Sequence, residues 1–321
     1  AKAPGNALIA PNLPKVSVGA GWFNWGPIDV PDDQMQDVRT VNWAKSELRK
    51  NYDKPFFLAC GFYRPHLPWY VPKKYFDKFP LDEIILPKVK LDDLDDLPEY
   101  GKRFARERYS GSWGTDLNEG ERDHDLVIKY DQWKKGVQAY LASISFVDTY
   151  VGELLDGLDE SKYADNTIVV LWGDHGWHLG EKQHWRKQAL WEDTTHVPFI
   201  ISYPKKIQKN IVCEHPVSFI DMYPTLVDLA DIPKKEGLDG KSLKELLINP
   251  SMEWNRPVLS TYGKGNHAVR SGKWRYIEYR DGSSELYDHQ NDPNEWYNLS
   301  GKESFEKVVQ NLKKIIPSTE K

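Results

Sequence analysis

An acidic residue and a histidine stand directly after an apolar run in the middle of the sequence. Residues 167–172 read Thr-Ile-Val-Val-Leu-Trp, Gly173 ends the run, and Asp174 and His175 follow. In α/β enzymes the side chains at the carboxyl end of a buried strand line the site, and a carboxylate and an imidazole both bind divalent ions. Lys187 follows twelve residues after His175 and offers a positive charge to an anion. The pattern predicts half of a site, with two metal ligands and a cation.

These residues also allow a purely structural interpretation. Asp174 would then cap the turn that follows it, and His175 would pack beside Trp177. That interpretation is favoured for an isolated Asp-His pair. The strand in front, the glycines on either side and Lys187 downstream favour the metal site instead.

A second candidate lies in a proline-rich loop. Residues 55–61 form a continuous apolar run, which predicts a short strand that is buried on both faces. The run leads into a loop in which Pro65 and Pro68 flank His66 and stiffen its backbone. A histidine can donate a proton to a leaving oxygen near neutral pH. We therefore predict that His66 is a second contact for the anion, beside Lys187.

The spacing of apolar residues predicts the elements that carry these side chains. Residues 132–158 repeat apolar side chains at helical intervals, and a strand follows from Asn166. A helix followed by a strand is the repeating unit of a parallel sheet. Further predicted elements are helices at 34–50 and 218–230 and a strand at 196–202.

After about residue 255 the pattern changes to short strands with tight turns. The predicted strands are 257–262, 268–269, 274–279 and 284–287, with a hairpin turn at Asp281-Gly282 and a final amphipathic helix at 303–316. The sequence as a whole predicts an α/β sandwich with a mostly parallel central sheet flanked by helices, plus a small C-terminal antiparallel sheet. The expected division is a main α/β domain over 1–254 and a small subdomain over 255–321.

Composition limits the possible partners. The chain has 321 residues with a formal net charge of −5, which argues against nucleic acid as the main partner. No apolar run approaches the roughly 20 residues that a membrane span needs. The chain opens Ala-Lys-Ala-Pro-Gly-Asn without a signal peptide, so we interpret its N-terminus as processed or cut. Cys60 and Cys213 are expected to be unpaired thiols in the core rather than a disulfide, and exposed members of the thirteen tryptophans could stack on sugar rings.

Three segments make the chain recognisable. They are residues 55–69, Pro-Phe-Phe-Leu-Ala-Cys-Gly-Phe-Tyr-Arg-Pro-His-Leu-Pro-Trp; residues 172–181, Trp-Gly-Asp-His-Gly-Trp-His-Leu-Gly-Glu, with Lys187 behind them; and residues 285–299, Glu-Leu-Tyr-Asp-His-Gln-Asn-Asp-Pro-Asn-Glu-Trp-Tyr-Asn-Leu. On these motifs the chain resembles the type I sulfatases of the alkaline-phosphatase-like superfamily. Within them it is similar to the branch of iduronate 2-sulfatase. The resemblance runs from about residue 20 to about residue 300.

This resemblance implies a mechanism and roles for single residues. In the family, a cysteine or serine becomes formylglycine, whose hydrate attacks the sulfur of a sulfate ester, and a calcium ion holds the sulfate and the nucleophile. By motif, Asp174 and His175 would bind the Ca²⁺, and Lys187 and His66 would contact the sulfate. His66 would also protonate the leaving alcohol, and His267 would be a weaker substrate contact. The family further implies a sulfated saccharide substrate and a periplasmic or secreted location.

The chain departs from the family at the nucleophile. The family's Cys/Ser-x-Pro/Ala-x-Arg motif and its first metal aspartates precede the region matched here. The segment from Cys60 to Arg64 has Phe62 where the motif requires Pro or Ala, and Cys213 fits no better. We therefore expect the N-terminal part of a sulfatase to be absent, cleaved or on another chain, and this chain alone to be inactive or nearly so.

Two alternatives stay open at the level of sequence. A histidine beside the aspartate suits calcium less well than a purely oxygen-based set does, and it would suit a softer ion such as Mn²⁺ or Zn²⁺. Phosphonate and phosphodiester hydrolases of the same superfamily share this pair, and such a hydrolase is the second hypothesis. The third is a non-catalytic sugar-binding relative, which the missing nucleophile favours and the intact Asp174, His175 and Lys187 oppose.

Overall fold

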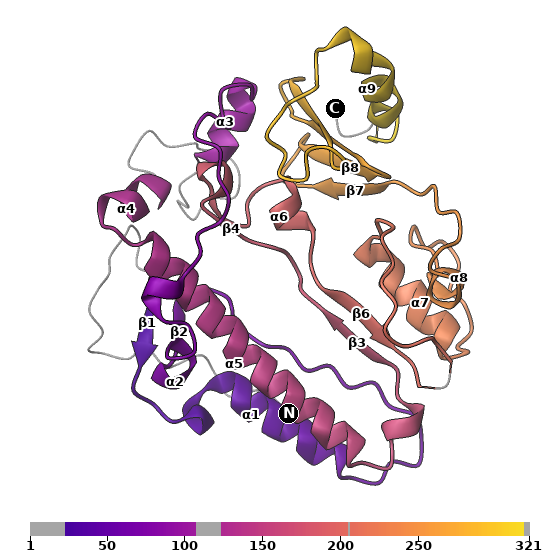
Figure 1. Cartoon of the computed structure of the whole chain (residues 1–321). Helices are drawn as coiled ribbons and strands as arrows, with labels where there is room; N and C mark the ends of the chain where they lie inside the picture. Colours follow the sequence, from indigo (N-terminus) through magenta and orange to yellow (C-terminus); the bar gives the residue numbers. More distant parts are fainter. Residues whose placement is uncertain (1–22, 107–122, 205, 318–321) are drawn as a thin grey trace. The chain divides into compact units, whose positions relative to one another are not determined.

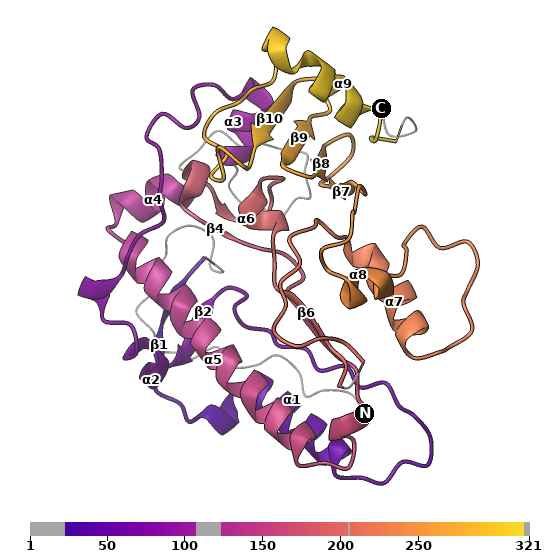
Figure 2. The same ribbon diagram turned by 45° about the vertical axis from the view of Figure 1, so that its right-hand side comes forward.

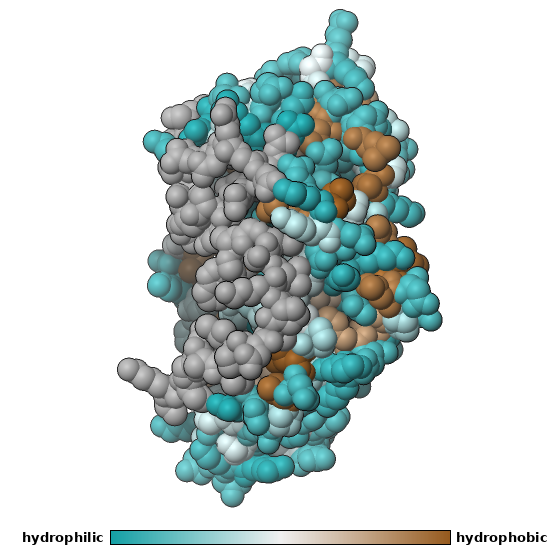
Figure 3. Space-filling view, turned by 90° about the vertical axis from the view of Figure 1, so that its left-hand side faces the viewer, coloured by the Kyte–Doolittle hydropathy of each residue, from teal (hydrophilic) through white to brown (hydrophobic). Residues whose placement is uncertain are grey.

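The structure, a computed structural model, describes residues 23–106, 123–204 and 206–317. They fall into two compact units (Figures 1 and 2). Unit 1 holds the described residues up to Lys88 together with 123–167, and unit 2 holds 89–106 and the described residues from Ile168 onward. No helix in these ranges is both long enough and apolar enough to cross a membrane. On the described part of the face in Figure 3, apolar residues form small groups among hydrophilic ones.

Two long helices form the frame of unit 1. Helices α1 (Gln36–Leu48) and α5 (Trp133–Asp159) lie side by side in both ribbon views (Figures 1 and 2). Because apolar residues three apart share one helix face, α1 buries them as a stripe. The stripe includes Val38, Val41 and Ala44. The two helices predicted from periodicity are confirmed, with ends displaced by no more than two residues.

A short parallel strand pair holds the end of the His66 loop. Strand β1 (Trp25–Ile28) pairs with β2 (Trp69–Pro72), and the rings of Trp25 and Trp69 stack at 5.5 Å between centroids. Trp69 is completely buried and also packs edge-on against Tyr140 of α5. The other elements of unit 1 are α2 (Lys73–Phe76), α4 (Asp123–Lys129), η1 (Asp32–Gln34), η2 (Leu81–Glu83) and η3 (Ala164–Asn166).

The apolar run at residues 55–61 does not form the predicted buried strand. It is irregular in this chain, and Phe57 keeps 83% of its surface exposed. A continuous apolar run predicts a strand that is covered on both faces. The described residues provide no strand ladder for this run, so it is not covered on both faces and that prediction is wrong here.

The strand before Asp174 is present, but the strand that pairs with it is antiparallel and not parallel as predicted. Strand β3 (Val169–Trp172) pairs antiparallel with β6 (Phe199–Ser202), although the sequence predicts a mostly parallel central sheet. Between them the chain returns through turns and the four-residue helix α6 (Glu192–Thr195), not through the crossover that parallel neighbours need. Among the described residues, only β1 and β2 form a parallel pair. This two-stranded sheet leaves three large apolar side chains at least 37% exposed: Leu171, Trp172 and Ile200.

The small C-terminal antiparallel sheet is confirmed. Its strands lie in the order β10-β9-β8-β7, and every neighbouring pair is antiparallel. Gly282 has a φ of 85° and closes the hairpin between β9 and β10, where Asp281-Gly282 predicts a turn. The strands are β7 (Val258–Thr261), β8 (His267–Ser271), β9 (Trp274–Glu278) and β10 (Ser284–Asp288).

Both faces of this sheet are covered. Along a strand, successive side chains point to opposite faces, so Tyr276 joins the core with helix α9 (Glu306–Lys313), whereas Ile277 joins the core with helix α3 (Glu99–Ala105). The second core also contains Trp191, which directly precedes α6. The remaining elements of unit 2 are β4 (His178–Leu179), β5 (Trp185–Arg186), α7 (Met222–Leu229), α8 (Lys244–Ile248), η4 (Glu181–Gln183), η5 (Phe219–Asp221) and η6 (Glu303–Phe305). The expected boundary between 254 and 255 remains a prediction.

Candidate active site

The turn after β3 is held by its backbone. The amide of Gly173 donates to the carbonyl of Pro198 at 3.0 Å. Gly176 and Trp177 donate to the carbonyls of Thr194 and Asp193 at 2.7 and 2.8 Å. A Cβ at residue 176 would lie 1.9 Å from the Asp193 carbonyl oxygen, so only glycine permits this approach. The turn therefore rests on α6.

Three of the predicted site residues come together at this turn. His175 Nδ1 lies 2.9 Å from the Gly176 carbonyl oxygen, which assigns the ring proton to Nδ1. Nε2 then carries a lone pair, and it lies 2.8 Å from Lys187 Nζ and 3.5 Å from Asp174 Oδ2. The Asp174 side chain is 83% exposed and that of His175 26%. The arrangement offers an imidazole nitrogen, a carboxylate and an ammonium group within a few ångströms of one another.

The other histidines near this turn have structural surroundings. His178 and His184 are buried, and their rings meet edge to face at 5.1 Å between centroids. His178 pairs with the Thr194 hydroxyl at 2.9 Å. Burial lowers the pKa of His184 to about 4, so its imidazole is neutral at neutral pH. His196 is exposed and lies 3.8 Å from Glu192.

The turn supplies one side of a metal site. Asp174 and His175 offer one carboxylate and one imidazole nitrogen, both suited to a divalent ion. Two ligands are fewer than such an ion takes. Within the described ranges, no third acidic or histidine side chain completes a group with them. The donor set therefore fits an ion whose remaining ligands come from elsewhere.

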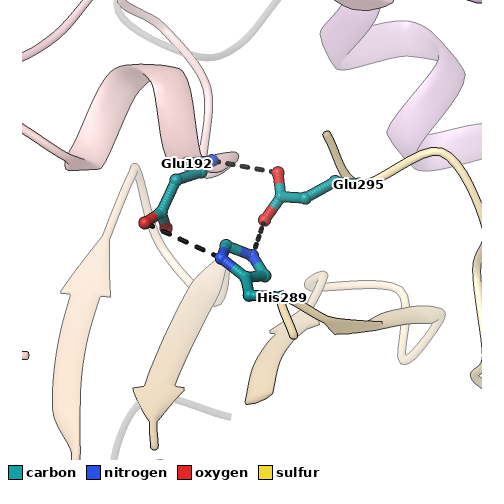
Figure 4. Close-up of side chains that lie close together, drawn as sticks. All are labelled: Glu192, His289 and Glu295. Carbon is teal, nitrogen blue, oxygen red and sulfur yellow. Dashed lines mark hydrogen bonds and ion pairs between the residues drawn. The ribbon is translucent and has the colours of Figure 1, made fainter. Parts of the chain in front are cut away.

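One group of three ligand-type side chains does occur among the described residues. Glu192, His289 and Glu295 each place a ligand atom within 4.8 Å of the others (Figure 4). Arg275 is paired with both of these carboxylates. Burial alone would raise the pKa values of the two glutamates, but the charges of Arg275 and His289 outweigh it and hold both pKa values below the ordinary range. The two carboxylates are therefore ionised and already neutralised by protein side chains.

In unit 1, His66 lies on a loop that is fixed by short-range contacts. Its Nδ1 is 2.7 Å from the Leu67 carbonyl oxygen, which leaves Nε2 for other partners. Its backbone amide donates to the Tyr63 carbonyl at 2.9 Å, and the two rings lie 4.9 Å apart. Trp69 Nε1 donates to the Pro65 carbonyl at 2.6 Å. The imidazole is exposed, as a proton donor to a substrate must be.

Asp37, which was not among the residues predicted from the sequence, holds the start of this loop. Its carboxylate accepts the backbone N–H groups of Tyr63 at 2.7 Å and Arg64 at 3.3 Å. Asp37 is 4% exposed on the inner face of α1. Burial raises its pKa, and the two N–H donors and Arg64 offset only part of that rise. An acidic residue on an otherwise apolar helix face was the signal that could have identified it.

The remaining predicted site residue is buried. His267 in β8 is 3% exposed, and its Nδ1 lies 2.9 Å from the Thr261 hydroxyl. Its role as a substrate contact stays a prediction. Cys60 and Cys213 are free thiols, as predicted, but neither lies in the core: Cys60 is half-buried and Cys213 is exposed.

Comparison with known proteins identifies the family. The family model described as Sulfatase matches residues 9–232, and the one described as N-sulphoglucosamine sulphohydrolase, C-terminal, matches residues 180–321. A sulfatase of Formosa agariphila is 41% identical over 296 residues, which cover 92% of this chain and 56% of the relative. Human iduronate 2-sulfatase is 34% identical over 187 residues, which cover 55% of this chain and 32% of the relative. The chain thus spans little more than half the length of the first of these relatives.

The fold of this chain is also similar to that of solved structures. A phosphonate monoester hydrolase from Silicibacter pomeroyi aligns with a TM-score of 0.75 at 21% identity, over 90% of this chain and 60% of that one. The predicted alkaline-phosphatase-like α/β fold is therefore confirmed. Since the family models cover both the Asp174 turn and the C-terminal sheet, the chain belongs to the sulfatase family.

Proposed function

We propose that this chain is part of a sulfuric-ester hydrolase that acts on a sulfated sugar. The proposal rests on one observation, the close grouping of Asp174, His175 and Lys187 at the end of β3. Such a group can bind a divalent ion and a sulfate together, because metal and ammonium charges neutralise the transferring group. Membership of the sulfatase family and the name of the iduronate 2-sulfatase relative support a sulfated sugar as the substrate class.

Asp174 and His175 would hold a divalent ion, with Ca²⁺ as the expected ion and Mn²⁺ or Zn²⁺ as the softer alternatives. When bound, the ion would stabilise negative charge on the sulfate oxygens. The bond from His175 Nδ1 to Gly176 keeps the Nε2 lone pair available for it. Lys187, which contacts that nitrogen in this structure, would then donate to the sulfate instead. The ammonium group would thus change partner when ion and substrate enter.

His66 would donate the proton that the leaving alcohol needs. Its Nδ1–H donates to the Leu67 carbonyl, so the ring would act as an acid in its doubly protonated form, with the transferable proton on Nε2. The loop contacts from Tyr63 and Trp69 fix the ring, which reduces the cost of orienting it for proton transfer.

The nucleophile would come from residues outside this chain. No segment of the sequence has the family's nucleophile motif. The exposed apolar side chains of β3 and β6, and of the run at 55–58, support a missing covering segment, because grouped apolar side chains on a surface are typically covered by another part of a protein or by a partner. We accordingly expect the chain alone to be inactive or nearly so, and the assembled enzyme to act in the periplasm or outside the cell.

Phosphonate hydrolysis is not favoured over sulfate hydrolysis. The likeness to the phosphonate monoester hydrolase, at 21% identity, shows the fold alone. A sugar-binding relative without catalysis is also less well supported, because binding alone does not require a lysine placed on a metal-type histidine.

The proposal is tested with the protein in the form that its gene encodes and with this chain alone. The gene product should hydrolyse 4-nitrophenyl sulfate much faster than a phosphonate monoester, and the chain alone should not turn over either one. Lys187→Ala should abolish most of the activity, whereas Lys244→Ala, which removes a half-buried lysine of α8 that pairs with Asp228, should not. Robust turnover by the chain alone, or a preference for the phosphonate, would contradict the proposal.

Ion binding is tested separately by calorimetry on the gene product. Calcium should bind to the unaltered protein and much more weakly to Asp174→Ala. Equal affinities would remove Asp174 from the proposed ligands.

A further inference from the structure

The turn that carries Asp174 and His175 depends on α6 for its position. Its Gly176 and Trp177 amides donate to two carbonyls of that helix. Helix α6 has four residues, and a helix this short has no stability of its own. Whatever fixes α6 therefore fixes the turn.

Arg275 of strand β9 supplies much of that support. Its side chain is 3% exposed, and Nη1 donates to the Leu190 carbonyl at 2.9 Å. Nη2 pairs with the carboxylate of Glu192, the first residue of α6. Nε lies 2.8 Å from Glu295 Oε1, in an ion pair that lacks the direction of a good hydrogen bond. These contacts enclose the start of α6.

Glu295 completes the enclosure from the loop after β10. Its Oε2 accepts the backbone N–H of Glu192 at 2.9 Å, and its Oε1 lies 2.8 Å from His289 Nε2. Its own backbone carbonyl accepts Nζ of the buried Lys182. Arg270 lies 3.5 Å from the Glu192 carboxylate and adds a second guanidinium. The first turn of α6 is thus held through the backbone N–H of Glu192 and through the Glu192 carboxylate.

The same side chains have the composition of a metal site, but their charges argue against one. The two carboxylates lie against the His289 imidazole (Figure 4). Arg275 also pairs with both carboxylates, and Arg270 pairs with that of Glu192. A divalent ion among them would have to displace Arg275 from both carboxylates and leave its charge buried without compensation, which is costly. The network is therefore balanced as a set of ion pairs.

We propose that Arg275, Glu192 and Glu295 are positioning residues for the candidate active site. They clamp α6, the carbonyls of α6 fix the Gly176 and Trp177 amides, and the Gly176 carbonyl fixes the ring of His175. The C-terminal sheet thereby sets the direction of a metal-type nitrogen about 100 residues earlier in the chain. The importance of Arg275, Glu192 and Glu295 for catalysis rests on the proposed function, whereas the structural link from Arg275 to Gly176 does not.

Amide hydrogen exchange tests the link on this chain. Glu192→Gln keeps the shape of the side chain and removes one charge, and it should speed exchange at the Gly176 and Trp177 amides by about tenfold or more. Lys273→Gln is the matched control, because Lys273 pairs with Asp288 at 2.6 Å in the same sheet. The control should leave both amides unchanged.

Selective ¹⁵N labelling of histidine separates positioning from a loss of stability. Glu192→Gln and Arg275→Lys should shift the ring signals of His175, assigned with His175→Gln. Arg275→Lys should shift them less than Arg275→Gln, because lysine keeps the positive charge although it lacks the several N–H donors of the guanidinium group. Unchanged His175 signals in a folded variant, or exchange that accelerates equally at all amides of unit 2, would overturn the proposal.

Manganese distinguishes this inference from the proposed function. Mn²⁺ that broadens the ring signals of His175 supports the ion site of the proposed function. No broadening at His175 would count against that function, and the exchange data would still decide the link to Arg275. Broadening centred on His289 would show that the ion-pair network takes a metal, and it would overturn the inference.

Discussion

The two segments that carry His66 and His175, the candidate acid and the candidate metal ligand, are held in different ways. The His66 loop is held by its own backbone and by one carboxylate, Asp37, from the preceding helix. The His175 turn is held by α6, which is in turn held by Arg275 and Glu295 from the far end of the sequence. The Asp37 contacts join residues 26 and 27 positions apart, whereas the contacts from Arg275 and Glu295 to Glu192 join residues 83 and 103 positions apart. Loss of the C-terminal sheet should therefore disturb His175 and leave His66 in place.

The two supports also differ in charge. Asp37 is a buried carboxylate held mainly by backbone N–H donors, and burial raises its pKa. Glu192 and Glu295 are paired with guanidinium groups, which hold their pKa values below the ordinary range against the effect of burial. The loop thus depends on hydrogen bonds and the turn on ion pairs.

The largest expected effect separates the two segments by their chemistry. In the assembled enzyme, Lys187→Ala should lower kcat by about 10²–10³ on aryl and alkyl sulfates alike, because it removes charge stabilisation. His66→Ala should cost about 10²–10⁴ on an alkyl sulfate but far less on 4-nitrophenyl sulfate, whose leaving group needs no proton. Steady-state kinetics on both substrates measure the difference. Equal losses for His66→Ala on both would show that it is not the general acid.

The next effect compares one glycine from each segment. Gly176→Ala should lower the free energy of unfolding by about 1–3 kcal/mol or more, because the new Cβ would meet the Asp193 carbonyl oxygen. Gly61→Ala, just before the His66 loop, has open space around its Cβ and should change it little. Urea unfolding followed by tryptophan fluorescence gives both values. Similar values for the two variants would contradict the close packing of the turn on α6.

A smaller effect is expected at Asp37. Asp37→Ala should cost about 1–3 kcal/mol, because the Tyr63 and Arg64 amides lose their acceptor. Asp37→Asn keeps one acceptor oxygen and should recover part of that loss. Exchange at those two amides should rise in Asp37→Ala while exchange at Gly176 stays unchanged. A parallel rise at Gly176 would show that the two segments are not independently held.

The smallest effect concerns pH and should have opposite signs in the two segments. Because burial raises the pKa of Asp37, the folded protein keeps the Asp37 proton to a higher pH than the unfolded chain does. The unaltered protein should therefore lose stability relative to Asp37→Asn as pH rises above 3.8. The lowered pKa of Glu192 means that its contribution is present above pH 4.5 and is lost as pH falls below that value. Each change should be about 1 kcal/mol or less. Urea midpoints are measured between about pH 3 and pH 7 for the unaltered protein, Asp37→Asn and Glu192→Gln. The difference between the unaltered protein and each variant should change with pH in opposite directions for the two variants. Changes in the same direction would contradict the comparison.

Sequence patterns predicted the parts of the fold in which one element's own residues decide its structure. The long helix α5 and the hairpin at Gly282 were found because periodicity and turn residues are local signals. The run at 55–61 was wrong because apolar residues show the tendency to be covered but not the presence of a covering layer. The direction of β6 was likewise set by the route of the chain through α6 and not by its own residues.

The candidate site shows the same difference between local and distant signals. Asp174, His175 and Lys187 lie in one short segment, and the structure brings them together. Their supports were missed because Arg275 and Glu295 act from about 100 residues away, through carbonyl and amide groups that every residue has. An arginine among the aromatic and apolar residues of β9 was the available signal.

The connection through α6 also works in the opposite direction. If the C-terminal sheet stabilises one orientation of His175, then an ion that binds His175 in that orientation must stabilise the sheet by the same free energy. The stability of the sheet would then depend on whether an ion is bound at His175, without any contact between the sheet and the ion. Its hydrogen exchange would slow on ion binding, and the tryptophan and tyrosine side chains around Arg275 offer an optical signal for the same event.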